Sequence, residues 1–265
     1  RDDLSSLSFK VRLVFQFIAV AIVLVGGLAT GILVPEQATY GINLSPGSLI
    51  STPAMLAATI VGGLVVSAGY VWFINLYNFM DGIDGIASVE AITVCAGAVL
   101  IYALEGFTSL IWPAVLLTGA VVGFLIWNFP PAKIFMGDAG SGFLGIILGL
   151  LSLQAAWISS QLLWAWLILL GVFIVDATVT LIRRLIRGDK VYEAHRSHAY
   201  QFASRQFGRH LPVTSAVGVI NLCWLLPVAL WVAHFGLDGA VGAVIAYVPL
   251  VILAIRFRAG ELEQR

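Results

Sequence analysis

Eight stretches of the chain are apolar over a length that can cross a membrane, and this feature limits the fold more than any other. A helix needs about 20 apolar residues to span roughly 30 Å of hydrocarbon. Hydrophobic residues make up 60% of the chain and charged residues 11%, whereas an average soluble domain has about 45–50% and about 25%. The sequence therefore excludes an ordinary soluble fold and predicts an all-α, polytopic membrane helix bundle. The predicted spans are residues 11–34, 50–74, 87–105, 109–127, 141–158, 162–182, 212–235 and 239–257.

Nothing in the sequence divides the chain into separate domains. It has no fixed-period repeat, no low-complexity tract and no long polar linker, so we expect a single membrane domain over residues 1–265. Its first residue is arginine, and the opening residues lack the order of charged, apolar and cleavage regions that defines a signal peptide. We therefore expect an N-terminally truncated sequence. Cys95 and Cys223 each lie in an apolar stretch and are too few for a disulfide framework.

The basic residues fall on one side of the predicted membrane if the connections alternate between its two faces. One face receives the N-terminal stretch and residues 75–86, 128–140, 183–211 and 258–265. These segments and the adjoining span ends carry all 14 lysines and arginines, and the opposite connections carry none. By the positive-inside rule the basic face is cytoplasmic. Because 14 acidic residues balance the charge, the composition gives no support to nucleic-acid binding.

Polar residues on this face gather into four clusters. Acidic residues are costly to place in a membrane protein, so their positions are informative. The clusters are Asp2 and Asp3; Asn75, Asn78, Asp81 and Asp84 in NLYNFMDGIDG; Asn128, Lys133 and Asp138 in WNFPPAKIFMGDAGSG; and His195, Arg196 and His198 in HRSHAY.

In the second cluster a polar side chain recurs at every third residue, from Asn75 to Asp84. Three residues advance an ideal helix by about 300°, so the first and last members end up about 180° apart. One continuous helix cannot direct all four side chains to one point, and Gly82 and Gly85 let the backbone leave helical geometry. We expect the turn to direct both aspartates toward a shared site. The alternative is a solvated turn, in which Asp and Gly are common.

The third and fourth clusters suit phosphate and cation binding. Asp138 lies in a glycine-rich turn, where small residues let a phosphate or a hydrated cation approach the backbone. Lys133 can pair with phosphate or act as a positive-inside anchor. Arg196 can bind phosphate oxygens bidentately, and the two histidines beside it can donate hydrogen bonds. The alternative for this basic loop is contact with anionic lipid headgroups.

Three further residues are left with open or no roles. Asp176 lies inside a predicted span, so it can form a structural ion pair or a helix–helix hydrogen bond, or take part in catalysis. We assign no role to His210 and His234. A histidine pair spaced as in HRSH is a poor zinc signal without a third ligand nearby.

The separation of acidic and basic groups on one membrane face suits phosphoryl transfer. Carboxylates can hold Mg²⁺, which prefers oxygen ligands and binds substrate phosphates. Cationic side chains can then neutralise charge on a diphosphate in its transition state. The clusters therefore predict phosphoryl transfer at the lipid–water boundary.

These four motifs, in this order and on this face, resemble those of the polyprenyl-phosphate N-acetylhexosamine-1-phosphate transferases, the integral membrane enzymes of glycosyltransferase family 4. The likeness covers nearly the whole chain and includes DATVTLIRR before HRSHAYQ. The short loops and the HRSH variant are more similar to the members that start O-antigen or related polysaccharides than to the one acting on muramoyl-pentapeptide. The resemblance implies that further helices precede Asp2.

The resemblance implies a reaction in which undecaprenyl phosphate attacks the β-phosphorus of a UDP-N-acetylhexosamine, giving a lipid diphosphosugar and UMP. It implies Mg²⁺, or Mn²⁺ in its place, as cofactor, and an active site on the cytoplasmic face of the bacterial inner membrane. It leaves open which UDP-sugar and which polysaccharide pathway are used. The oligomeric state is also open, with a homodimer as one option.

The resemblance also assigns roles within the clusters. The metal ligands are Asp138 and, as a second oxygen donor, Asn78. Asp2 or Asp3 deprotonates or positions the lipid phosphate, and Asp81 and Asp84 orient the nucleotide sugar or metal-bound waters. The substrate-binding residues are Asn75, Lys133, His195, Arg196 and His198, with support of Asn78 as the alternative role of Asn75.

Two other functions compete with this one. A transporter or lipid flippase would place ionisable groups near the bilayer midplane and often contains internal repeats, and neither feature is evident. A CDP-alcohol phosphotransferase is suggested by DGIDG, but Gly85 and Ile86 stand where that family has an Ala-Arg pair.

Overall fold

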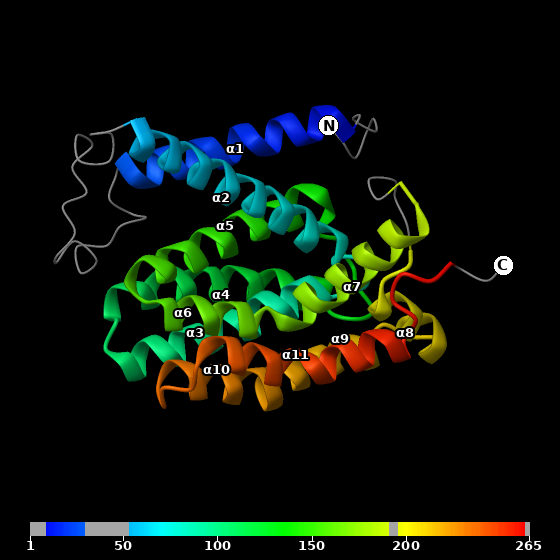
Figure 1. Ribbon diagram of the computed structural model, residues 1–265. Coiled ribbons are helices and arrows are strands. Elements are labelled where there is room, and N and C mark those ends of the chain that lie inside the picture. The colour runs from blue at the N-terminus through cyan, green and yellow to red at the C-terminus, as the bar shows by residue number, and fades with distance from the viewer. Residues whose placement is uncertain (1–8, 30–52, 191–195, 263–265) are drawn as a thin grey trace.

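The computed structural model describes residues 9–29, 53–190 and 196–262, and these ranges are helical without a β-strand (Figure 1). The described helices are α1 (Phe9–Ala29), α2 (Pro53–Phe79), α3 (Ile86–Glu105), α4 (Thr108–Asn128), α5 (Gly137–Ile158), α6 (Ser160–Leu169), α7 (Gly171–Arg187), α8 (Ala199–Phe207), α9 (Leu211–Ile220), α10 (Leu226–Ala233) and α11 (Gly239–Arg256), with a π-helical segment, η2 (Asn221–Leu225), between α9 and α10.

The all-α membrane bundle predicted from the sequence is confirmed. Six described helical segments are long and apolar enough to cross a membrane, and the bent pair α6–α7 brings the number to seven. The remaining predicted span, residues 11–34, corresponds to α1, of which Val11–Gly26 forms a shorter apolar helix.

The stretch predicted as one span over residues 162–182 is instead two helices, α6 and α7, that meet at an angle of 72°. Leu170 separates them with a ψ of 8°, outside helical geometry. Gly171 follows it, and a Cβ atom there would lie only 3.1 Å from the ring of Tyr247 on α11. The sequence changes character across the bend, because α6 is apolar while α7 carries basic residues in its last turn. A window that averages hydropathy cannot detect this break.

Close packing between α2 and α5 places the functional residues of these two helices at one end of the bundle. A Cβ atom on Gly145 would lie 3.0 Å from the Cα of Ile74, and one on Gly149 would lie 1.9 Å from a ring atom of Tyr70. The two helices run in opposite directions, so the C-terminal end of α2 meets the N-terminal end of α5 (Figure 1). On the other side of α2 lies α1, and the largely buried α3 packs against α4, α6 and α9.

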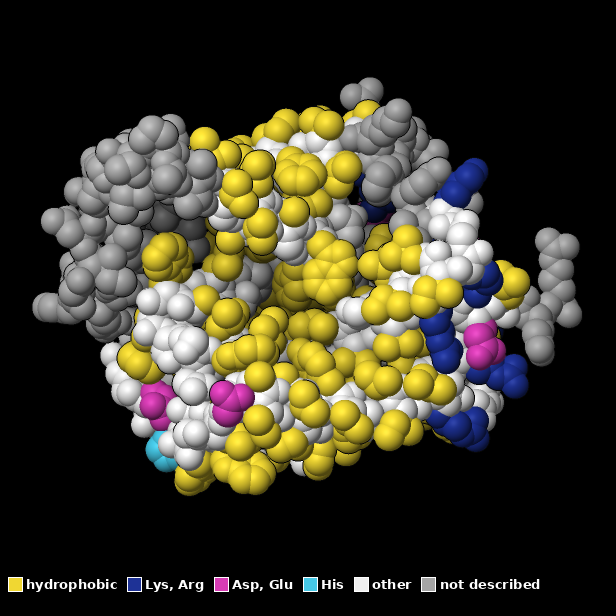
Figure 2. All heavy atoms as spheres, in the orientation of Figure 1, with side chains coloured by type: hydrophobic (Ala, Val, Ile, Leu, Met, Phe, Trp, Pro, Cys, Tyr) yellow, Lys and Arg dark blue, Asp and Glu magenta, His cyan; other side chains and the backbone are white. Residues whose placement is uncertain are grey.

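The bundle has a charged end and a broad apolar middle. Figure 2 shows Lys and Arg side chains gathered at one end of the molecule, with hydrophobic side chains over the surface between the ends. This basic end, as we call it, carries the α2–α3 and α4–α5 loops and α8. The opposite end carries Glu105, whose Oε1 lies 2.7 Å from Nδ1 of His234.

Candidate functional site

The centre of the candidate site is a contact between the end of α2 and the start of α5. Asn78 donates from Nδ2 to Oδ1 of Asp138 at 3.0 Å and to Oγ of Ser141 at 2.8 Å. Ser141 is buried and donates to the carbonyl of Gly137 at 3.0 Å. Asp138 also lies in the first turn of α5, where the helix dipole favours a negative charge. The structure therefore holds one face of this carboxylate in place and brings Asn78 and Asp138 together.

Asp81 adds a second carboxyl, close enough to Asp138 to be affected by its charge. Burial, and then the negative charge of Asp138, raise the pKa of Asp81 to about 7. A divalent cation placed between two such carboxyls would relieve their repulsion, and Mg²⁺ commonly uses one or two carboxylates while keeping several waters. Among the described residues, no group of three or more His, Cys, Asp or Glu side chains could hold a metal. Asp81 and Asp138 are compatible with a hydrated Mg²⁺ that takes one or two carboxylates from the protein.

The orientation of Asn78 bears on its predicted role as a metal ligand. Its amide nitrogen faces Asp138, because a carboxylate accepts hydrogen bonds and an amide oxygen cannot donate them. In this geometry Asn78 fixes the carboxylate. Direct coordination would require the amide to rotate so that its oxygen faces the cation.

The turn between α2 and α3 leaves helical geometry as expected, with α2 ending at Phe79 and Gly85 at a φ of +74°. It does not direct both aspartates the same way, however. The Oδ2 atom of Asp84 accepts from the backbone N–H of Ala132 at 3.1 Å and lies 3.1 Å from Nδ1 of His210. The described contacts of Asp84 therefore brace the turn against the α4–α5 loop and the start of α9, and they give His210 a contact that the sequence did not indicate.

Asn128 provides a second brace for the same turn. This buried side chain accepts from the backbone N–H of Gly85 at 3.0 Å and donates to the carbonyl of Ile134 at 2.9 Å. The α4–α5 loop also carries Lys133, which is exposed and has its Nζ 5.3 Å from the ring centroid of Trp127. Two of the predicted clusters are thus joined by hydrogen bonds that leave the lysine at the surface.

Asn75 lies away from this centre, in the interface between α1 and α2. It exchanges hydrogen bonds with the amide of Gln16 at 2.8 and 3.1 Å and donates to the carbonyl of Val71 at 2.8 Å. These contacts fix α1 against α2.

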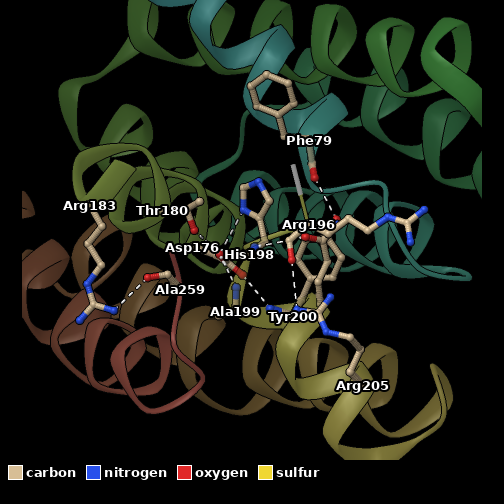
Figure 3. A network of polar contacts seen from close by, with 11 residues as sticks. Phe79, Asp176, Thr180, Arg183, Arg196, His198, Ala199, Tyr200, Arg205 and Ala259 are labelled. Carbon is tan, nitrogen blue, oxygen red and sulfur yellow. Dashed lines mark hydrogen bonds and ion pairs between the residues drawn. The ribbon is translucent and has the colours of Figure 1, made fainter. Parts of the chain in front are cut away.

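The segment that carries Arg196 and His198 is organised around Asp176 of α7 (Figure 3). Its Oδ1 accepts from the backbone N–H of Ala199 at 2.9 Å and lies 3.2 Å from Nδ1 of His198, while its Oδ2 accepts from the backbone N–H of Tyr200 at 3.0 Å. Thr180 donates to the same carboxylate at 3.2 Å. Asp176 thus caps the first turn of α8 and orients the ring of His198, which is the structural one of the two roles that the sequence leaves open.

Tyr200 joins this network to the α2–α3 turn. Its hydroxyl donates to the carbonyl of Phe79 at 2.9 Å, and a Cβ atom on Gly82 would lie 2.1 Å from that hydroxyl. Only glycine lets the tyrosine approach so closely. The rings of His198 and Tyr200 are stacked with centroids 5.6 Å apart. His198 is therefore buried next to the α2–α3 turn.

Arg196 lies at the surface of the same segment. Its side chain is exposed and points away from Asp176 in Figure 3. Its carbonyl accepts a hydrogen bond from Arg205 of α8 at 3.1 Å. Asp2, Asp3 and His195, which the sequence analysis assigned to the site, lie outside the described residues.

The sequence analysis missed Arg12 and Gln16 on α1. Nη2 of Arg12 lies 3.0 Å from Oδ2 of Asp138, and Gln16 pairs with Asn75. The two residues are four positions apart in an apolar helix, so they share a face. That spacing is a signal which could have identified them. Tyr200 had no comparable signal, because its role depends on a distant glycine.

The structure thus collects three of the four predicted clusters at the basic end. The carboxylates of Asp81 and Asp138 lie on one part of this end. Arg196 and His198 come just before Tyr200, which joins α8 to the α2–α3 turn. Such an arrangement can hold a divalent cation and the phosphate oxygens of a substrate.

Comparison with known proteins agrees with this chemistry. Residues 1–156 match the profile of "Glycosyl transferase family 4". The chain is 31% identical over 205 residues to a "Probable undecaprenyl-phosphate N-acetylglucosaminyl 1-phosphate transferase" of Bacillus subtilis, which covers 75% of this chain and 52% of the relative. It is 28% identical over 179 residues to an "Undecaprenyl-phosphate alpha-N-acetylglucosaminyl 1-phosphate transferase" of Thermotoga maritima, covering 64% of this chain and 56% of the relative.

A third relative has a different acceptor in its name. It is a "Decaprenyl-phosphate N-acetylglucosaminephosphotransferase" of Mycolicibacterium smegmatis, 37% identical over 160 residues, which are 50% of this chain and 39% of the relative. The chain spans about half the length of the Bacillus and Thermotoga relatives. The profile match covers more than half of the chain, and the chain belongs to glycosyl transferase family 4.

Proposed function

We propose that this protein transfers an N-acetylhexosamine 1-phosphate from a UDP-sugar to undecaprenyl phosphate. An oxygen of the lipid phosphate attacks the β-phosphorus of the UDP-sugar, the bond from that phosphorus to the bridging oxygen breaks, and UMP leaves. The names of the Bacillus and Thermotoga relatives support both substrates. We propose further that the product starts O-antigen or a related envelope polysaccharide, and that the basic end faces the cytoplasm across the inner membrane.

The observation that carries the proposal is the hydrogen bond between Asn78 and Asp138, with Asp81 beside them. A Mg²⁺ ion held by Asp138 would neutralise charge on the diphosphate as it transfers. Asn78 fixes that carboxylate, and in the proposal Asp81 would orient the nucleotide sugar or metal-bound waters. Asp84 holds the turn that carries Asp81, and through the turn it can orient the nucleotide sugar.

The cationic residues act on the other side of the diphosphate. Arg196 is exposed and can bind phosphate oxygens with both arms of its guanidinium group. His198 is held by Asp176, so its ring needs no reorganisation when substrate arrives. In the proposal Lys133 and His195 add positive charge, Asp2 or Asp3 positions or deprotonates the lipid phosphate, and Asn75 supports Asn78 through α2.

The proposal predicts that UMP release depends on a divalent cation at Asp138. Full-length protein in detergent, supplied with undecaprenyl phosphate and UDP-GlcNAc, should release UMP with Mg²⁺ or Mn²⁺ and stop when the metal is chelated. Asp138→Asn should lower kcat by about a hundredfold or more, because it removes the charge that binds the cation.

The matched control is Asp189→Asn, which removes another carboxylate at the basic end that pairs with Arg184 and Arg187. It should leave UMP release near the wild-type rate. A wild-type rate in a folded Asp138→Asn protein would contradict the proposal. The same assay with UDP-GlcNAc, UDP-GalNAc, UDP-FucNAc and UDP-QuiNAc would identify the sugar.

A further inference from the structure

Arg12 of α1 is the cation in direct contact with the proposed metal ligand. Its Nη2 lies 3.0 Å from Oδ2 of Asp138, and the two side chains are 34% and 44% exposed. The other carboxylate oxygen accepts from Asn78. The arginine therefore contacts the oxygen of Asp138 that the amide of Asn78 leaves open.

The direction of Arg12 is set by the packing of α1. Gln16, one turn later on the same face, is locked to Asn75 by two hydrogen bonds. Val20, a further turn along, is fully buried against α2. Residues four apart share a helix face, so these contacts hold Arg12 toward α5. The position of its guanidinium group follows from the interface between α1 and α2.

An arginine and a divalent cation cannot both sit at the same carboxylate oxygen. The guanidinium group stays protonated under all ordinary conditions, so the two positive charges repel each other. A partly exposed ion pair contributes little, so the need to break it lowers the affinity of the wild-type protein for the divalent cation by about fivefold at most. Arg12 can therefore be displaced by the metal at small cost. Because α1 packs against α2 through Gln16 and Val20, the displaced guanidinium group would stay near Asp138.

We propose that Arg12 is a substrate-binding residue that neutralises Asp138 until the metal binds and then contacts the phosphate oxygens of the substrate. This inference rests on the proposed function, because it takes Asp138 as the metal ligand. A guanidinium group matches phosphate geometry bidentately. The same side chain thus neutralises the negative charge of Asp138 in the metal-free protein and that of the diphosphate once metal and substrate are bound.

The test measures Mn²⁺ binding by electron paramagnetic resonance, without turnover, on full-length protein in detergent. Arg12→Met should bind Mn²⁺ about twofold to fivefold more tightly than wild type, because its competitor is gone. The Mn²⁺-loaded variant should bind UDP or undecaprenyl phosphate about tenfold more weakly or worse. The ligand that loses affinity identifies which phosphate Arg12 contacts, and a loss for either one supports the inference.

Two further variants make the result specific to this site. Arg256→Met removes an exposed arginine at the basic end of α11 and should change neither affinity. Arg12→Lys keeps the charge but loses the planar fork, so it should bind Mn²⁺ like wild type and UDP or undecaprenyl phosphate more weakly. If Arg12→Met fails to fold, the phosphate-binding part of the test can still be carried out with Arg12→Lys.

Unchanged Mn²⁺ and phosphate affinities in Arg12→Met would overturn the inference, as would weaker Mn²⁺ binding in that variant. Asp138→Asn separates this failure from failure of the proposed function. If Asp138→Asn abolishes Mn²⁺ binding while the Arg12 variants match wild type, only the role of Arg12 is wrong. If Asp138→Asn binds Mn²⁺ as wild type does, the metal assignment itself is wrong.

Discussion

At the scale of single residues, the site depends on side chains that hold other side chains. Asn78 donates to Asp138, Asp84 accepts from the α4–α5 loop, and Asp176 holds the backbone beside His198. Polar groups that orient a ligand are costly to remove, because the ligand then loses its geometry. Substitutions at these residues should therefore affect binding and catalysis as strongly as substitutions at the groups that touch substrate.

Asn78→Asp distinguishes a supporting residue from a metal ligand. An aspartate offers oxygen ligands but cannot donate to Asp138, and its charge repels that carboxylate. If Asn78 supports Asp138, the variant should lose about tenfold to a hundredfold in kcat. Steady-state rates of UMP release, with Mn²⁺ affinity measured in parallel, check this. A variant with wild-type rate and tighter Mn²⁺ binding would show instead that Asn78 coordinates the metal.

Gly82→Ala should disturb the contact between the α2–α3 turn and Tyr200. The added methyl group would meet the tyrosine hydroxyl at 2.1 Å, and overpacking of this kind costs about 1–3 kcal/mol. Thermal unfolding and UMP release measure the effect. Tyr200→Phe removes the hydroxyl, so the double variant should be closer to wild type than Gly82→Ala alone. Additive losses would contradict the contact, and Gly142→Ala, with open space around it, is the control.

At the scale of elements, the bend between α6 and α7 gives the histidine segment its support. A straight continuation would carry Asp176 away from α8, whereas the 72° angle lets its carboxylate cap the first turn of that helix. Residues of α7, α8, α9 and α11 line an open apolar pocket of about 260 Å³, and Asp176 is part of its wall. The bend thus decides where His198 lies relative to the α2–α3 turn.

Asp176→Ala should loosen the first turn of α8. The variant loses the acceptor for two backbone N–H groups, and loss of a helix cap costs about 0.5–2 kcal/mol. Hydrogen exchange should accelerate at the amides of Ala199 and Tyr200, while the amides of α4 exchange as before. Asp176→Asn keeps one oxygen acceptor, so its exchange rates at these two amides should lie between those of wild type and Asp176→Ala. Unchanged exchange at these amides in Asp176→Ala would show that the cap contributes nothing.

At the scale of the whole molecule, the helical fold and the gathering of polar loops at one end could be predicted from the sequence, but the contacts between those loops could not. Apolar length identifies the spans, and the one-sided placement of lysine and arginine predicts which loops share an end. Tyr200 was missed because its role depends on which helix face meets which neighbour. Arg12 shares a helix face with Gln16, but the spacing alone does not show that this face meets α2 and α5. The bend at Leu170 was missed because hydropathy over a window does not register one residue outside helical geometry.

The different contacts of Asp81 and Asp84 in DGIDG could not be predicted from the sequence either. Spacing alone suggested that Asp81 and Asp84 share a site, but Asp84 turns to Ala132 and His210 while Asp81 lies beside Asp138. Asp84 is oriented by the backbone N–H of Ala132, which lies nearly fifty residues away in the chain. Tertiary contacts of this kind leave no local pattern.

The central claim is that distant segments meet around one divalent cation at the basic end, and metal-directed backbone cleavage tests it most directly. Fe²⁺ replaces Mg²⁺ in full-length protein, ascorbate and peroxide generate radicals at the metal, and mass spectrometry maps the cuts. The account predicts cuts in both 78–82 and 137–141 that excess Mg²⁺ suppresses and Asp138→Asn abolishes. Cuts confined to other segments, or cuts unchanged in Asp138→Asn, would contradict it.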